Sequence, residues 1–186
     1  MACISTFLRV AALSAVVMWA SDLPRPVPPL NLTTPTGEKI SLESLRGKVV
    51  LLEFFLTECP HCQRSAGAIE PLYKQWRARG LEVVAVAINP DAKQRISEFR
   101  QRFNTTYPIA LGDQTMVRTV GDLSVVKQFF VPYMFIIDRK GAIRYEHPGG
   151  DAAFYDNEAV NLRNELDALL KEPASARADR KPAPKS

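Results

Sequence analysis

The chain has 186 residues, of which 46% are hydrophobic and 24% are charged, and its net charge is +4. A chain of this length can bury a single core without metals or disulfides to support it. The charge is modest and forms no basic stripe with interleaved aromatic residues, so the composition argues against a nucleic-acid partner.

The first 21 residues form a separate segment. Arg9 precedes an eleven-residue apolar run, Val10 to Ala20, which Ser21 and Asp22 follow. The run is shorter than the ~20 apolar residues that a membrane-spanning helix needs, and its pattern is typical of a secretory signal. We therefore expect residues 1–21 to be a signal peptide, or a signal anchor where it is not cleaved, and the protein to be exported to the periplasm or another extracytoplasmic space.

Turn residues organise the segment that follows. Prolines at positions 24, 26, 28 and 29 predict an extended leader. Apolar residues on either side of the turn at 35–38 predict a hairpin over 30–42, and residues 41–47 predict one helical turn that ends at Gly47. The nearly continuous apolar run 49–56 is typical of a strand covered on both faces.

Helical and strand patterns then alternate to the end of the chain. Helices are predicted over 59–79, around 96–103, over 120–130 or from 123, and over 154–170, the last bearing Val160, Leu162, Leu166 and Leu169. Strands are predicted over 81–88 and 107–111, and a hairpin over 133–146. This order predicts an α/β domain over residues 22–171 with a mixed central sheet and helices on both faces. Residues 172–186, rich in Ala, Pro, Lys and Arg, predict a disordered basic tail.

Two cysteines, Cys59 and Cys62, enclose Pro60 and His61 where the first long helix is predicted to begin. The backbone N–H groups and the dipole of a helix start stabilise a thiolate. Cys59 is therefore the predicted nucleophile, and Cys62 the residue that resolves its mixed disulfides. Cys3 lies in the leader, so the mature chain has no cysteines for a structural disulfide framework, and this pair is predicted to serve thiol exchange.

Three polar side chains near the pair are candidates to tune it. Glu53 stands within an apolar strand, where a carboxylate must titrate or pair. It is either the proton acceptor for Cys62 or the partner of a lysine such as Lys74. His61, when protonated, would stabilise the Cys59 thiolate, whereas Glu58 would disfavour it; the alternative for His61 is that it only faces solvent.

Further motifs lie on either side of the cysteine pair. Leu30-Asn31-Leu32 and the segment 42–50 precede the first core strand, and Val131-Pro132 precedes the strand 133–138. With the Cys-Pro-His-Cys motif, these segments resemble the exported TlpA-like thiol-disulfide oxidoreductases of the redoxin group in the thioredoxin superfamily. The likeness covers roughly residues 29–147. It implies a thioredoxin fold with an N-terminal hairpin extension and an insertion before a cis-proline at Pro132, although most X–Pro bonds are trans.

The resemblance also implies roles and partners. Glu53 falls where thioredoxins place a buried acid, and the backbone of Val131 is expected to pair with an extended substrate chain. Glu58 stands where the family usually has Trp, so the surface that meets the substrate differs in this chain. Tyr133, with Phe129 and Phe130, either lines a substrate groove or packs in the core.

The activity that the resemblance implies is exchange of disulfides with protein thiols or disulfides through the Cys59–Cys62 pair. We expect no metal and no cofactor beyond this redox-active disulfide, a monomer, and a membrane thiol-electron carrier as one partner. Cytochrome maturation is the setting that the resemblance suggests. Pro60-His61 resembles DsbA-type oxidases instead of reductive members, so the direction of electron flow stays open.

Two other functions use the same residues. A thiol peroxidase of the peroxiredoxin type needs Pro-x-x-x-Thr-x-x-Cys, and here Leu52 and Leu56 occupy the Pro and Thr positions, with Thr57 one position off. A copper or zinc chaperone would use the dithiol as soft ligands. Zinc needs two further ligands, for which the sequence offers only His147 and carboxylates outside the motif.

Overall fold

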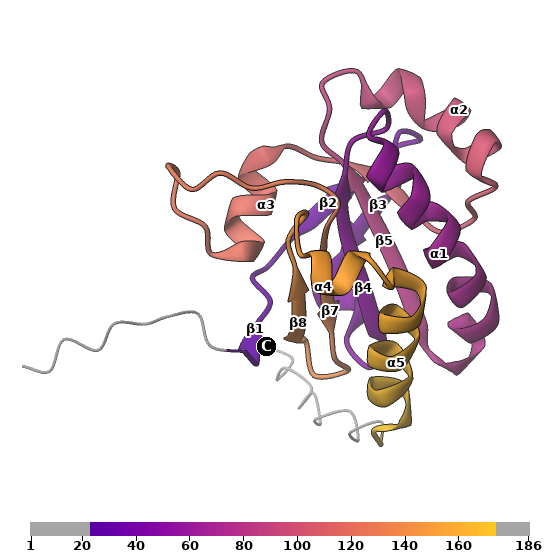
Figure 1. Cartoon of the computed structure of the whole chain (residues 1–186), viewed down its shortest axis with the longest axis vertical. Helices are drawn as coiled ribbons and strands as arrows, with labels where there is room; N and C mark the ends of the chain where they lie inside the picture. The colour runs from indigo at the N-terminus through magenta and orange to yellow at the C-terminus, as the bar shows by residue number, and fades with distance from the viewer. Residues whose placement is uncertain (1–22, 174–186) are drawn as a thin grey trace, which may run out of the picture.

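The computed structural model describes residues 23–173, so the predicted signal segment, residues 1–21, and residues 174–186 of the predicted tail lie outside the described part. The described chain forms one sheet with helices on both faces (Figure 1). Its strands are β1 Arg25–Pro26, β2 Asn31–Thr33, β3 Lys39–Ser41, β4 Val49–Phe55, β5 Leu81–Ala87, β6 Ile109–Leu111, β7 Tyr133–Ile137 and β8 Ala142–His147. Its helices are α1 Pro60–Trp76, α2 Ala92–Phe103, α3 Gln114–Gly121, α4 Ala152–Tyr155 and α5 Glu158–Lys171, with short 3-10 turns at Leu42–Leu45 and Arg77–Arg79.

The sheet is mixed, as predicted, and its strand order is β1-β8-β7-β4-β5-β6-β2-β3. Strands β4, β5 and β6 run parallel, whereas β7 is antiparallel to β4 and β8 is antiparallel to β7. Every residue of β4 is buried, because this strand has neighbours on both edges and helices on both faces. The apolar run that predicted a doubly covered strand is thereby confirmed.

Alternate side chains of β4 enter two separate cores. Leu51 and Phe55 join the core that α1, α2 and α5 cover, whereas Leu52 and Phe54 join the core that α3 and the N-terminal hairpin cover. Glu53 is two residues from Leu51 and from Phe55, so its side chain lies on the same face of the sheet, under α1 and α5. Figure 1 shows α1 and α5 on one side of the sheet and α3 on the other.

The described ends of the chain lie at the same end of the sheet. Strand β1 pairs with the first residues of β8, with Pro26 opposite Ala142. Because β7 runs antiparallel to β4, with Ile137 opposite Val50, this place is level with the beginning of β4 and not with its end. The C-terminal turn of α5 is held nearby, since the Arg139 guanidinium donates to the Leu170 carbonyl at 3.4 Å. Within residues 23–173, no helix combines the length and the apolar character that crossing a membrane requires.

The predicted helix over 120–130 is wrong. The helix in this region is α3, which begins earlier because the Asp113 side chain accepts hydrogen bonds from the N–H groups of Thr115 and Met116. It ends at Gly121, followed by Asp122 in the left-handed conformation. Residues 123–130 form an irregular loop in which Val125 and Val126 are exposed, so their apolar character reflects no helix face.

The last helical segment also differs from its prediction. It is divided into α4 and α5, because the chain leaves helical geometry around Asn157, the residue that precedes α5. Of the apolar residues named for this segment, Leu162, Leu166 and Leu169 face the core. Val160 does not, because it is 58% exposed, so it lies on the outer face of α5.

Candidate active site

The Cys-Pro-His-Cys motif lies directly after β4, at the end of a parallel strand where α/β folds place their sites. Cys59 is the residue that caps α1, and Pro60 is the first helical residue, a position that suits proline because its missing N–H would have no helical partner. The Cys59 N–H donates to the Leu56 carbonyl at 3.1 Å, and the Cys59 carbonyl accepts from Gln63 N–H at 3.0 Å. The strand and the helix together fix the backbone of the first cysteine.

The two thiols occupy different environments. Cys59 is partly exposed, and its Sγ lies 3.9 Å from the carbonyl oxygen of Val131. Cys62 is buried in the core beneath α1. Burial raises the pKa of Cys62 far above its ordinary value, the charges of Glu53 and Cys59 raise it further, and a backbone contact at Leu56 only partly opposes them. A partner can therefore reach Cys59, whereas Cys62 needs a nearby base before it can react.

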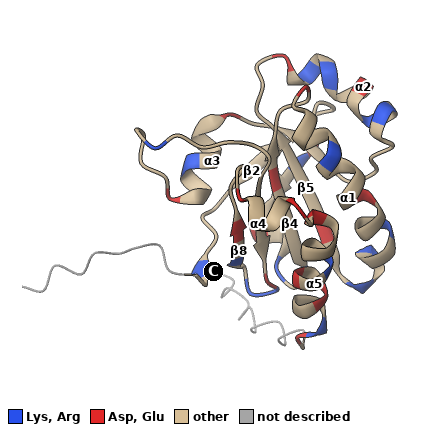
Figure 2. Ribbon diagram, viewed as in Figure 1, with Lys and Arg blue, Asp and Glu red and all other residues tan. Residues whose placement is uncertain are grey.

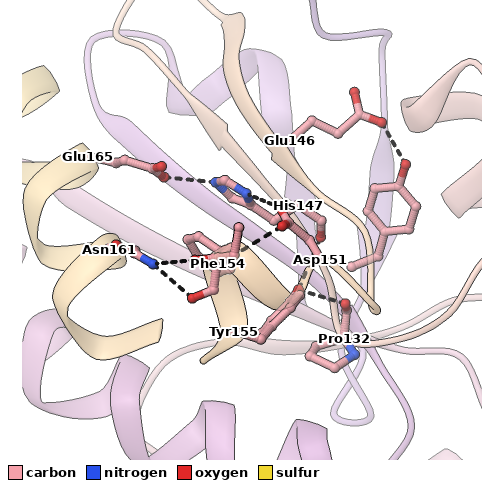
Figure 3. Close-up of polar contacts among 10 residues, drawn as sticks. Pro132, Glu146, His147, Asp151, Phe154, Tyr155, Asn161 and Glu165 are labelled. Carbon is pink, nitrogen blue, oxygen red and sulfur yellow. Dashed lines mark hydrogen bonds and ion pairs between the residues drawn. The ribbon is translucent and has the colours of Figure 1, made fainter. Parts of the chain in front are cut away.

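Val131 and Pro132 lie beside Cys59, and the peptide bond between them is cis, as the resemblance predicts. The Pro132 carbonyl accepts a hydrogen bond from the Tyr155 hydroxyl at 2.7 Å, and the same hydroxyl lies 3.0 Å from the His147 carbonyl (Figure 3). Tyr155 therefore joins the proline loop to the end of β8. It comes from α4, which sequence patterns did not separate from the last helix.

His147 fixes the position of α4. Its ring stacks on Phe154 with centroids 3.6 Å apart, its Nε2 lies 2.9 Å from Glu165, and its Nδ1 lies 3.2 Å from Asp151 (Figure 3). Burial lowers the pKa of His147, but the hydrogen bonds and charges of Glu165 and Asp151 outweigh it, so the pKa is raised above its ordinary value. The ring is thus held between two acids, which favours its charged form.

This arrangement predicts a pH-dependent contribution to stability. Because the pKa of His147 is raised in the folded state, its charged contacts contribute fully below the ordinary histidine value of about 6.5 and are lost as pH rises through the folded value. We expect His147→Gln to lower the free energy of unfolding by about 1 kcal/mol more at pH 6 than at pH 9. Urea unfolding at both pH values measures the difference, and a loss of equal size at both would contradict it.

Glu53 lies within β4, and its charge acts on the buried thiol of Cys62. Its side chain is 1% exposed, and its Oε1 has no hydrogen-bond partner among residues 23–173. Burial raises the pKa of Glu53 well above its ordinary value, and the charges of Glu158 and Cys59 raise it further. Lys74, the alternative partner, instead pairs with Glu70 at 3.0 Å. Glu53 is therefore not the salt-bridged residue that the alternative described.

The other predicted site residues have defined neighbours. His61 is exposed, and its Nδ1 lies 2.6 Å from the Arg64 guanidinium; an arginine only donates, so Nδ1 is the acceptor. Glu58 is exposed and pairs at 2.8 Å with Arg95 of α2, a helix with several basic residues (Figure 2). Its charge near Cys59 is therefore partly balanced, an effect that the motif alone did not indicate.

Tyr133 does not line a surface groove. Its ring is buried and stacks on Phe135 at 4.9 Å, and its hydroxyl donates to Glu146 at 2.6 Å. The interpretation of Tyr133 as a substrate contact is therefore corrected, because its position at the start of β7 directs it into the core. Of the aromatic residues near Pro132, Phe130 is the exposed one, with 60% of its side chain accessible.

Phe130 separates two hollows of about 480 and 460 Å³ next to the dithiol. The first is lined by Cys59 itself, with Leu56, Ile88 and Phe129; the second is lined by His61 and Pro132. Arg118 holds the loop that carries Phe130, since its guanidinium donates to the carbonyls of Ser124 and Lys127 at 2.7 and 2.9 Å. A substrate chain bound at Cys59 would therefore meet a hollow on each side of the Phe130 side chain, which forms a ridge between them.

Sequence patterns missed two polar residues of this region, Tyr155 and Glu158. Both stand in the last helical segment, where the apolar spacing drew attention to leucines and not to the residues between them. Glu158 lies in the first turn of α5, and its Oε1 is buried without a partner in the described part of the chain. The available signal was an acidic residue at a helix start, which is common on surfaces.

Comparison with known proteins identifies the family. Residues 24–146 match the model of the AhpC/TSA family. The chain belongs to this family. The AhpC/TSA protein described here is 31% identical over 117 residues to the thiol-disulfide oxidoreductase ResA of Halalkalibacterium halodurans, a match that covers 61% of each chain. It is 35% identical over 124 residues to the thioredoxin-like protein YneN of Bacillus subtilis, covering 66% of this chain and 69% of that one.

Solved structures show the same fold for this AhpC/TSA protein. A thioredoxin-family thiol:disulfide interchange protein from Chlorobium tepidum superposes with a TM-score of 0.65 at 21% identity, covering 81% of this chain and 99% of that one. BsSco, of the Sco family of cytochrome c oxidase assembly proteins, gives a TM-score of 0.59 at 17% identity, covering 81% and 96%. The chain is thus a TlpA-like redoxin with a thioredoxin fold, as its sequence motifs implied.

Proposed function

We propose that this protein is an exported thiol-disulfide oxidoreductase that exchanges disulfides with protein cysteines. The observation that carries the proposal is the pairing of a reachable thiol, Cys59, with a buried one, Cys62, at the start of α1. The names of ResA and YneN support it. The chain spans 61% of the length of that ResA. Its activity, substrates and partners are therefore proposals, and they are argued from the geometry of this chain.

In the reducing direction, the Cys59 thiolate attacks one sulfur of a substrate disulfide and expels the other as a thiolate. Cys62 then transfers its proton to Glu53 and attacks the Cys59 sulfur, which releases the second substrate thiolate and leaves a Cys59–Cys62 disulfide. Two electrons pass from the dithiol to the substrate, and the substrate thiolates take up protons from water. The oxidising direction reverses these steps.

We propose that an extended substrate segment lies along Val131, with side chains in the hollows on both sides of Phe130. The position of the Val131 carbonyl beside Cys59 Sγ supports this placement. Glu58 contributes an acidic rim, balanced by Arg95. The protein is proposed to act as a monomer without a metal or organic cofactor, and to exchange electrons with a membrane thiol carrier.

The arrangement favours this function over the two alternatives. A peroxidase would need a hydroxyl directed at the Cys59 thiolate, but the hydroxyl of Thr57 accepts a hydrogen bond from Asn89 Nδ2 at 3.0 Å. A zinc or copper chaperone would need ligands beyond the dithiol. His147 is instead held by Asp151 and Glu165, and the described residues contain no group of three side chains placed to hold a metal ion.

The test is equilibration of the protein with glutathione buffers, followed by alkylation and mass spectrometry. We expect a reversible two-electron couple in which Cys59 and Cys62 oxidise together, reduction of insulin disulfides by the reduced form, and no turnover of hydrogen peroxide. The measured potential also decides the direction: a low value supports a reductase and a high value a disulfide donor. A dithiol that binds metal tightly but does not equilibrate with glutathione would overturn the proposal.

The same assay tests the substrate surface through two matched exposed residues. Phe130→Ser should lower kcat/KM for insulin about fivefold or more, because a protein substrate loses the ridge between the hollows. The small disulfide of oxidised glutathione should react at an unchanged rate. Val160→Ser is the control, since Val160 is also exposed but lies on α5. Equal losses in the two variants would remove Phe130 from the substrate surface.

A further inference from the structure

Four buried polar atoms from β4, α1, α5 and the segment before β6 have no hydrogen-bond partners in the described residues. They are Glu53 Oε1, Ser65 Oγ, Tyr107 Oη and Glu158 Oε1. Leaving a buried polar group unpaired costs about 1–3 kcal/mol, so such a cluster is unfavourable for stability alone. Three of the four atoms belong to β4, α1 and α5, whose residues also enclose Cys62, the thiol that must release a proton. The cluster is therefore more simply explained by proton movement than by packing.

Glu53 can accept that proton but cannot by itself release it. The residue is 1% exposed, and it stands in the middle of a strand with neighbours on both edges. Helices α1 and α5 pack over this face of the sheet. A proton on Glu53 therefore needs a second group before it reaches water.

Glu158 has the properties of that second group. It stands in the first turn of α5, where one carboxylate oxygen is buried on the cluster side while the residue as a whole is only half-buried. Its pKa is raised by burial, and Ser65 and Arg64 of α1 oppose that rise. The carboxylate thus borders both the buried cluster and a solvated arginine.

We infer that Glu158 is a positioning residue that controls the protonation of Glu53 and carries the proton from Glu53 to solvent during resolution by Cys62. The inference rests on the proposed function. Cys62 gives its proton to Glu53 and attacks the Cys59 sulfur; Glu53 gives the proton to Glu158, which returns it to water. Groups facing Glu158 are Ser65 and Arg64 of α1, Glu53 of β4, Tyr107 before β6 and Tyr155 of α4.

The electrostatic sign of this coupling gives a specific expectation. The negative charge of Glu158 raises the pKa of Glu53. Glu158→Gln removes the charge and keeps the shape, so Glu53 ionises at lower pH and the pH midpoint of the resolving step moves downward. The same change removes the proton carrier, so the plateau rate should fall about fivefold or more. Substitution of a residue with only a structural role would not move the pH midpoint of the resolving step.

The experiment follows resolution directly. Reduced full-length protein is mixed with oxidised glutathione, which Cys59 attacks, and acid quenching with mass spectrometry measures decay of the Cys59–glutathione adduct between pH 5 and 9. We expect the lowered midpoint and plateau for Glu158→Gln, with Glu158→Asp close to wild type in midpoint because it keeps the charge. Glu172→Gln, a charge change at the far end of α5, is the control.

The outcomes separate this inference from the function on which it rests. If the wild-type protein forms the adduct and resolves it, but Glu158→Gln shows the wild-type midpoint and plateau, then Glu158 has no part and the proposed function stands. If the wild-type protein never forms the Cys59–Cys62 disulfide, the proposed function fails first. Thermal unfolding of each variant identifies a loss of rate that reflects only a loss of folded protein.

Discussion

Cys62→Ala should accumulate mixed disulfides between Cys59 and protein partners, whereas Cys59→Ala should accumulate none. The reason is the difference in access between the two sulfurs: Cys59 is partly exposed beside the Val131 carbonyl, and Cys62 is buried. Without Cys62, the adduct on Cys59 has no resolving thiol and persists. The trapped fraction should rise from near zero in the wild type to most of the protein within one round of exchange.

Non-reducing electrophoresis after mixing with a disulfide-bonded protein such as oxidised insulin measures the trapped species, and peptide mapping locates the linkage. Cys59→Ala is the matched control, since it changes the same atoms three residues away. Equal trapping by the two variants would show that the nucleophile is assigned to the wrong cysteine.

Glu53→Leu should raise the free energy of unfolding at pH 8 by about 1–3 kcal/mol, because it removes a buried carboxyl group whose Oε1 has no hydrogen-bond partner in the described residues. The pKa of Glu53 is raised by burial and by the charges of Glu158 and Cys59. A carboxyl group with a raised folded pKa binds more protons folded than unfolded, so the protein loses stability as pH rises from the ordinary glutamate value toward the folded value. The gain from Glu53→Leu should therefore shrink at pH 4, below both values.

The same substitution, Glu53→Leu, should lower activity. Cys62 loses the carboxylate that accepts its proton, so resolution of the Cys59 adduct should slow by about a hundredfold at neutral pH. Urea unfolding and the adduct-decay assay measure the two effects on the same samples. A variant that is stabilised and resolves at the wild-type rate would remove Glu53 from the mechanism.

Glu70 provides a matched comparison for Glu53. Both side chains are buried, with exposures of 5% and 1%. The Glu70 carboxylate accepts hydrogen bonds from the N–H and the hydroxyl of Thr106 at 2.8 and 2.7 Å and pairs with Lys74. Glu70→Leu should therefore destabilise the protein, because it leaves the Thr106 N–H without its acceptor. Opposite signs for one substitution at two buried glutamates would show that partners, and not burial alone, decide the outcome.

Those elements whose patterns depend on nearby residues could be predicted from the sequence. The doubly buried β4, the 133–146 hairpin and the helix after Cys59 follow from apolar spacing and turn residues. The error at 120–130 has a physical cause: Val125 and Val126 are apolar but exposed, and a periodicity argument assumes that apolar residues face a core. Asp113 caps the N-terminus of α3 and so determines where the helix begins. In the sequence it is a single capping residue, which is a weak signal for a helix start.

The sequence could predict those parts of the site whose residues are close together in the chain. Cys59, Cys62 and Glu53 are close in sequence, and Val131-Pro132 forms a recognisable motif. Glu158 and Tyr155 reach the same region only because α5 packs over β4 and α4 contacts the proline loop. Nothing local in their sequence indicates these contacts. The prediction that Tyr133 contacts substrate was wrong for a different reason. Its position next to Pro132 in the sequence does not reveal which face of β7 its side chain occupies.

The placement of the two described chain ends has a practical meaning for attachment. Strand β1 and the last turn of α5 both lie level with the beginning of β4, whereas Cys59 follows its end. A tether, affinity tag or immobilising surface joined to either end therefore holds the domain by one pole and leaves the opposite pole free. Partner proteins would approach the dithiol from the side that faces away from the point of attachment.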